Sequence, residues 1–151
     1  MRRIQHTRFS VTGHPQPKGS TRAFVPKGWT RPVITGANPK SKPWEEAIHD
    51  AACSEISVAS PVTGHSAFRV RLRFVMPRPK RLRADIRISQ LHLVRPDLDK
   101  LCRCVCDALT GVAWRDDSQV TALWATKRYT RGEEEARVDI TLTEINGEDR
   151  I

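Results

Sequence analysis

The sequence has no long apolar run, few aromatic residues and no acidic residue before Glu45. No window reaches the continuous apolar length that crosses a membrane, and the first residues carry charge without an apolar segment. We therefore expect a cytoplasmic protein with no membrane partner. The hydrophobic content of 38% is adequate for a packed core, and 151 residues fit a single domain.

The four cysteines lack the spacing of a zinc site. Cys102, Cys104 and Cys106 are two residues apart in one expected helix, where Cys102 and Cys106 share a face and Cys104 points away. We interpret them, together with Cys53, as small core residues and free thiols.

Acidic residues are absent from two stretches, Met1–Trp44 and Phe68–Ala84, and both are rich in Lys and Arg. With a formal net charge of +9, this pattern points to nucleic acid or another anionic surface as the partner. One such stretch is typical of a solvated face or a flexible arm, but two of them in a chain that also carries an acidic cluster favour contact with phosphate. The cations expected to contact DNA are Lys18, Arg22, Lys27, Arg69, Arg71, Arg73, Lys80, Arg81 and Lys100.

Apolar periodicity predicts an α+β fold, a single small domain with a mixed, mainly antiparallel sheet and two principal helices packed on it. The expected strands are Thr7–Thr12, Phe68–Met76, Val120–Tyr129 and Ala136–Glu144, and the expected helices cover about 43–57 and Asp99–Leu109. The last two strands are joined through Arg131-Gly132 and should form an antiparallel hairpin. Trp114 and Trp124 are expected in the core.

The domain covers residues 1–151 and contains a long basic Gly/Pro-rich loop at about 13–43. Loops of this length in compact domains are usually functional or disordered, and our hypothesis is an arm that tracks DNA and orders on binding. Later in the chain, Arg69, Arg71 and Arg73 alternate with apolar residues of the expected strand Phe68–Met76. That row of arginines either holds phosphate or merely keeps one face of the sheet soluble, and the sequence favours neither reading.

Acidic residues gather in two later segments, Arg95-Pro-Asp-Leu-Asp-Lys-Leu101 and Trp114-Arg-Asp-Asp-Ser-Gln-Val120. Taken singly, Asp99 is best read as a helix N-cap and Asp116-Asp-Ser118 as a turn. Together, Asp97, Asp99 and Asp117 could meet at one end of the sheet and hold hard divalent cations through oxygen. Carboxylate-bound metal inside a basic protein suits phosphodiester hydrolysis.

Three segments follow one another in the order Arg95–Leu101, Cys106-Asp-Ala-Leu-Thr-Gly-Val112 and Asp116-Asp-Ser-Gln-Val120. They match the pattern basic-Pro-Asp-x-Asp-Asn-Leu, Asp-Ala-Leu and Asp-Asp-x-Gln-Val, and so the sequence resembles the RusA family of Holliday-junction resolvases, especially its phage and prophage members. The early segment Pro15–Phe24 is also similar to the Pro-x-Pro-Lys-Gly-Arg-x-Arg segment of phage members.

The resemblance implies a homodimeric endodeoxyribonuclease that requires Mg²⁺, for which Mn²⁺ could substitute. Such enzymes bind four-way DNA junctions and nick opposed strands in recombination and repair, in a bacterial or phage-infected cytoplasm. Asp97, Asp99 and Asp117 correspond to the catalytic, metal-binding aspartates of the family. Lys100 stands where the motif usually has Asn, and Arg103 stands at the position of a common catalytic Lys. Arg is a poor proton donor, so the exchange at Arg103 changes the chemistry.

Two further acids match the motif in supporting places. Asp116 precedes Asp117, and Asp107 would pair with Arg103 along a helix face. Two alternatives stay open. One is a non-catalytic nucleic-acid-binding module, such as a phage regulator, in which the acids only cap and turn. The other is a nuclease that acts on flaps, forks or other branched DNA.

Overall fold

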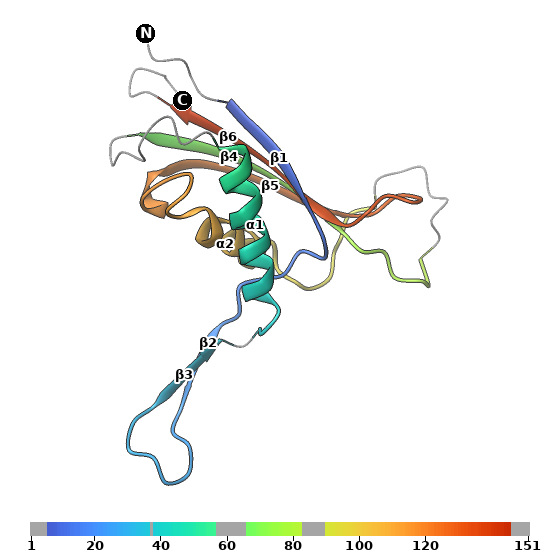
Figure 1. The fold of residues 1–151 in the computed structure, drawn as a ribbon. Coiled ribbons are helices and arrows are strands. Elements are labelled where there is room, and N and C mark those ends of the chain that lie inside the picture. Colours follow the sequence, from blue (N-terminus) through green and yellow to red (C-terminus); the bar gives the residue numbers. More distant parts are fainter. Residues whose placement is uncertain (1–5, 37, 57–65, 83–89, 146–151) are drawn as a thin grey trace.

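The computed structural model describes residues 6–36, 38–56, 66–82 and 90–145. Both helices pack on one face of a four-stranded sheet (Figure 1), so the predicted α+β fold is confirmed. In the described residues, no helix is long and apolar enough to cross a bilayer. The elements in chain order are β1 (His6–Thr12), β2 (Thr21–Phe24), β3 (Val33–Gly36), α1 (Ser41–Glu55), β4 (Ala67–Met76), α2 (Leu98–Leu109), a short 3-10 helix (Asp117–Gln119), β5 (Val120–Tyr129) and β6 (Arg137–Ile145).

The strands of the main sheet run in the order β1-β6-β4-β5. β6 is antiparallel to both of its neighbours, whereas β4 and β5 are parallel. The predicted hairpin between the last two strands is therefore wrong, because β4 lies between them. The connection after β5 crosses the end of β4, where Thr130 N donates to Met76 O at 2.9 Å. Because β4 lies between β5 and β6, its backbone N–H and C=O groups find hydrogen-bond partners on both edges.

One cluster of apolar side chains joins the helices to the sheet. Alternate residues of β4 point into it, and Val70 and Leu72 are completely buried there. Trp114 lies in this core as predicted, but Trp124 does not, since it is 55% exposed. The parallel register sets Trp124 beside Arg71 on the opposite face of the sheet. The main contributors from other elements are Phe9, Val11, Trp44, Ile48, Leu101, Val105, Leu109, Val138, Ile140 and Leu142.

The stretch at 13–43 is not a loop throughout. β2 and β3 pair as an antiparallel hairpin that projects away from the sheet and helices (Figure 1). Residues that favour strands, such as Phe24, Val33 and Ile34, flank a turn that contains Pro26 and Gly28. The expectation of one long Gly/Pro-rich loop is corrected to an arm with a hairpin in it.

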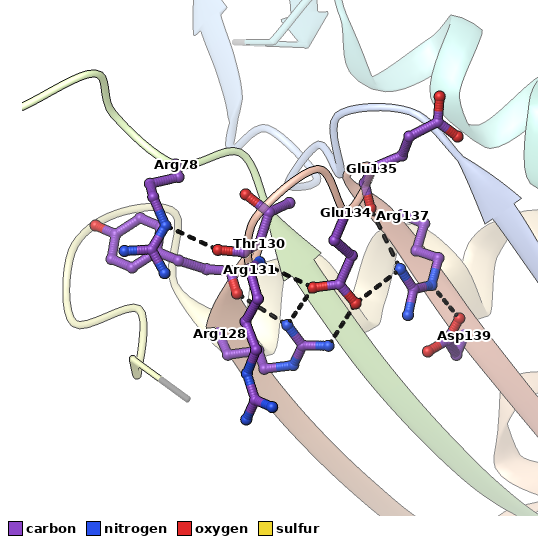
Figure 2. Close-up of polar contacts among 9 residues, drawn as sticks. Arg78, Arg128, Thr130, Arg131, Glu134, Glu135, Arg137 and Asp139 are labelled. Carbon is purple, nitrogen blue, oxygen red and sulfur yellow. Dashed lines mark hydrogen bonds and ion pairs between the residues drawn. The ribbon is translucent and has the colours of Figure 1, made fainter. Parts of the chain in front are cut away.

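A ladder of charged side chains holds the connection between β5 and β6 (Figure 2). Arg128 donates through Nη1 and Nη2 to the two carboxylate oxygens of Glu134, both at 2.7 Å. Arg137 adds an ion pair with Glu134 at 3.0 Å and donates from Nε to Asp139 Oδ1 at 2.8 Å. The hydrogen bonds from Arg128 lower the pKa of Glu134 to about 2, against an opposing effect of desolvation.

Replacing Glu134 with Gln should destabilise the fold by about 1–3 kcal/mol at pH 7, because the negative charge is lost and one of the two acceptor oxygens becomes an NH2 group that cannot accept from Arg128. The pKa of Glu134 is lowered from 4.5 to about 2, so its contribution is present above pH 4.5 and is lost as the pH falls toward 2. Urea unfolding at several pH values should therefore show a smaller acid dependence in Glu134→Gln. The control is Glu133→Gln at the exposed neighbouring position, and an equal effect of both variants would contradict the role of the ladder.

Gly13 should not tolerate a side chain. Its φ is +142°, and a Cβ would lie 2.8 Å from Cζ3 of Trp44. We expect Gly13→Ala to destabilise the protein by about 1–3 kcal/mol through strain and overpacking. Gly36→Ala is the control, since a Cβ at Gly36 meets no atom within 4 Å. Thermal unfolding of the two variants checks this, and equal melting temperatures would refute it.

Candidate functional site

Two of the predicted site aspartates lie at the start of α2. Asp97, rather than Asp99, occupies the N-cap position, and its side chain makes no capping hydrogen bond. The Asp97 carboxylate instead pairs with Lys100 Nζ at 3.3 Å, with both side chains about half exposed. Asp99 is exposed in the first turn. Both carboxylates thus stand at the positive end of the helix dipole, which favours negative charge.

The Asp97 carboxylate borders a hollow of about 550 Å³ between the start of α2 and the segment that follows β1. Lys18 N donates to Lys100 O at 3.0 Å, and Asn38 Nδ2 donates to Pro17 O at 2.9 Å. These contacts dock the basic arm beside the aspartate. The lining residues are His14, Pro15, Gln16, Pro17, Asn38, Arg95, Pro96, Asp97 and Lys100.

Asp99 faces a different hollow, of about 510 Å³, between α2 and β5. Arg103 lines it one turn further along the helix, with Leu123 and Ala125 opposite. Arg103 is exposed, so its guanidinium is available to a phosphate that enters beside Asp99. Asp99 and Arg103 therefore share one accessible surface.

The buried Cys102 and the half-buried Cys106 of α2 line this hollow. Burial raises the pKa of Cys102 to about 11, and the charge of Asp99 adds to the effect. Burial and then the charge of Asp117 raise the pKa of Cys106 to about 12. Both thiols are free and stay protonated near neutral pH, as predicted. Cys104 is also buried, but Cys53 is exposed and so is no core residue.

Asp117 is held at the opposite end of α2. Its Oδ1 accepts hydrogen bonds from Thr110 Oγ1 at 2.7 Å and from Trp114 Nε1 at 2.8 Å. Thr110 follows the last residue of α2, so the length of the helix, roughly 18 Å for its 12 residues, lies between this site and the N-cap. The neighbouring Asp116 caps the short 3-10 helix by accepting from Ser118 N.

The structure does not gather the three aspartates into a metal centre. Across the described residues, no group of three or more His, Cys, Asp or Glu has the spacing to hold a metal ion. The reason is that α2 separates Asp117 from the other two carboxylates. The donors fit a hard divalent cation in chemistry, because all three are carboxylate oxygens, but not in their arrangement here.

Lys18 ties the basic arm to both helices. Its Nζ lies 2.8 Å from Glu45 Oε1 of α1 and 2.9 Å from Asp107 Oδ2 of α2. The hydrogen bond to Glu45 is the main cause of a raised pKa at Lys18, and Asp107 adds to it. Asp107 thus pairs with Lys18, not with Arg103 as expected, since it is turned toward α1. The ammonium predicted to contact DNA is already matched by two carboxylates.

Apart from Lys18 and Arg22, the cations predicted to contact phosphate lie in four places. Lys100 stands beside Asp97, and Lys27 is exposed between β2 and β3. Lys80 and Arg81 are exposed after β4. The Arg22 side chain is outside the part of the chain that is described. The arginines of β4, namely Arg69, Arg71 and Arg73, lie on the face of the sheet turned away from the helices.

The sequence did not reveal the residues that position the acids. Thr110 and Trp114 orient Asp117, and Gln119 Oε1 accepts from the backbone N of Arg115 at 2.8 Å and of Asp116 at 3.1 Å. Gln119 also donates from Nε2 to Ser66 O at 2.9 Å, which anchors the turn near the start of β4. One of these residues could have been found from the sequence. Gln119 stands three residues after Asp116, which is the spacing of a capping box.

Two comparisons with known proteins gave matches over most of the chain. The family model described as endodeoxyribonuclease RusA matches residues 13–143, which include both aspartate segments and the arm. A protein of Bacillus subtilis (strain 168), named "Uncharacterized protein YqaN", is 28% identical over 145 residues. The alignment covers 92% of this chain and 96% of that protein, so the two are similar over nearly their full lengths.

The structural role of Lys18 can be separated from a role in DNA binding. Lys18→Met should lower the free energy of unfolding by about 1–3 kcal/mol, because it leaves two adjacent carboxylates without their cation. The pKa of Lys18 is raised above 10.5 in the fold, so its contribution is complete below pH 10.5 and is lost as the pH rises through the folded value.

The matched control is Lys27→Met, which removes the same charge at an exposed position of the arm. Urea unfolding should show a change within about 0.5 kcal/mol for this variant. An equal free energy of unfolding for the two variants at pH 7 would show that the Lys18 ion pairs do not stabilise the fold.

Proposed function

Since the chain belongs to the RusA endodeoxyribonuclease family, we propose that it resolves Holliday junctions by paired nicking during recombination and repair. The observation that carries the proposal is the exposed pair of carboxylates, Asp97 and Asp99, set beside Lys100 and Arg103 in a protein of net charge +9. Acids placed among cations suit a phosphodiester substrate held close to a metal. We expect the protein to work in the cytoplasm of a bacterium or an infected host.

The proposed cofactor is Mg²⁺, with Mn²⁺ as a substitute, and its proposed ligands are Asp97, Asp99 and Asp117. Asp117 is bound to Thr110 and Trp114 at the other end of α2, so it would join the other two carboxylates only if this segment rearranged on binding. Such a cation would activate water and stabilise the leaving oxygen of the phosphodiester. The chain itself supplies hard oxygen donors and, at Asp97, a neutralising partner in Lys100 at 3.3 Å. Lys100 would exchange its carboxylate for a phosphate when substrate and cation arrive, because a cation at Asp97 repels the ammonium.

Arg103 has the role of a charge stabiliser in this proposal. It lines the same hollow as Asp99, one turn away on α2. A guanidinium stays protonated at any working pH and can donate two parallel hydrogen bonds to a phosphate. Arg103 would therefore hold the phosphodiester and screen its charge, and leave proton transfer to water or another group.

The proposed assembly is a homodimer. A four-way junction presents two equivalent strands, and a two-fold protein places one site on each of them. The β2–β3 arm projects from the rest of the molecule (Figure 1) and carries the exposed Lys27 between its two strands, so it is suited to reach along a DNA branch. A second candidate function, a non-catalytic module that binds branched DNA, is favoured by one observation, the separation of Asp117 from Asp97 and Asp99.

Asp99→Asn should reduce cleavage of a mobile four-way junction by about 100-fold or more, since it removes charge at the reacting centre. Junction binding should be retained, because the cations that contact phosphate remain. Asp50→Asn, at an exposed position of α1, should cleave like the wild type. The assay compares symmetric nicking in Mg²⁺, Mn²⁺ and EDTA, and titration with Mn²⁺ followed by electron paramagnetic resonance reports metal binding independently.

Three other outcomes would each point away from the proposal. Tight junction binding without cleavage in either metal supports the non-catalytic module. Faster cleavage of a flap or a fork at the same salt concentration supports a different branched substrate. Undiminished cleavage by Asp99→Asn would remove this carboxylate from the mechanism.

A further inference from the structure

The face of the sheet turned away from the helices carries a row of side chains from all four strands. In the register, Arg8 pairs with Thr141, Thr141 with Arg71, and Arg71 with Trp124. Residues directly opposite one another on neighbouring strands point to the same side of a sheet. The row therefore crosses the whole sheet from β1 to β5, and its two ends are roughly 14 Å apart. Both helices cover the other face (Figure 1).

This face is positively charged. Arg8, Arg71 and Arg73 are exposed on it, and together they border a hollow of about 390 Å³. An acid on the same face, Asp139, accepts from Arg137 Nε and from Ser10 Oγ, each at 2.8 Å. Because Arg137 compensates the charge of Asp139, the net charge of Arg8, Arg71 and Arg73 on this face remains positive and can attract an anionic partner.

Trp124 is the unusual member of the row. An indole that is 55% exposed at the edge of a polar, basic surface leaves apolar area in water. Its neighbour in the register is the exposed Arg71, so an aromatic plane and a guanidinium stand side by side. An aromatic ring next to a cation on an open sheet suits a nucleotide, whose base stacks while its phosphate is neutralised.

Charge and shape decide between possible occupants. A second copy of the chain would set arginines against arginines, which is repulsive in a symmetric interface. In an intact duplex the bases cover one another, so Trp124 could not stack on them. An unpaired strand presents both bases and phosphates.

We propose that this face binds single-stranded nucleic acid, with a base stacked on Trp124 and phosphates held by Arg71, Arg73 and Arg8. The inference rests on the proposed junction nuclease and deepens it, since it assigns a second DNA surface. This surface lies on the opposite side of the sheet from Asp99. In the proposed substrate the arms are duplex, so the strand held here would be the bases unpaired at the branch point, separate from the strand that is cut.

Fluorescence anisotropy with a labelled short oligothymidylate tests the proposal in EDTA, where no cleavage interferes. Trp124→Leu should weaken binding about tenfold, because leucine keeps apolar area but cannot stack, whereas Trp124→Phe should retain most of the affinity. Arg71→Gln should weaken binding and lower the salt dependence by about one phosphate contact. Arg131→Gln removes the same charge from an exposed turn between β5 and β6 and should change affinity far less.

Wild-type affinity in Trp124→Leu, or an equal loss in Arg131→Gln and Arg71→Gln, would overturn the proposal. A change of oligomeric state in Trp124→Leu, measured by sedimentation, with unchanged affinity for the oligonucleotide, would assign the face to protein contact and overturn it as well. Failure of the nuclease proposal is distinguishable. It would leave the metal-free affinity for single strands intact, while failure of the present inference would leave junction cleavage dependent on Asp99.

Discussion

The pairing of β4 with a neighbouring strand on each of its edges organises both faces of the sheet. Because β4 lies between β5 and β6, its Val70, Leu72 and Phe74 form the centre of the core, and α1 and α2 have one apolar face to cover. The same pairing turns the arginines of β4 to the other side. A single alternating strand thus separates an acidic site on the helix layer from a basic surface behind it.

Two charged bridges keep the irregular parts of the chain on this sheet. Lys18 joins the arm to α1 and α2 through Glu45 and Asp107, and the carboxylate of Glu134 joins Arg128 to Arg137 where the chain crosses the end of β4 (Figure 2). Each bridge replaces apolar packing in a segment that has little of it. Charge-assisted hydrogen bonds of this kind hold loops in place with few residues.

We propose two chemically different DNA surfaces on one thin scaffold, namely the site on α2 and the arginine face of the sheet. Asp99 and Arg103 share an exposed surface of α2, where a phosphate can approach, while Arg71 and Trp124 stand on the far side of the sheet. A sheet one layer thick allows a branched substrate to be held at both surfaces at once. In a dimer, the two-fold axis would repeat this arrangement on the second strand.

Part of the fold and of the site followed from local sequence patterns. Alternation and helical periodicity predicted the α+β class, the strand Phe68–Met76 and α2, and the motifs around Asp97 and Asp117 identified the family. Three features became visible only in the folded chain: the pairing of the strands, the exposure of Trp124 beside Arg71, and the binding of Asp117 to Thr110 away from Asp99. The physical reason is that periodicity gives each side chain a face of its own element, whereas strand order and the ends of helices depend on contacts between residues distant in the chain.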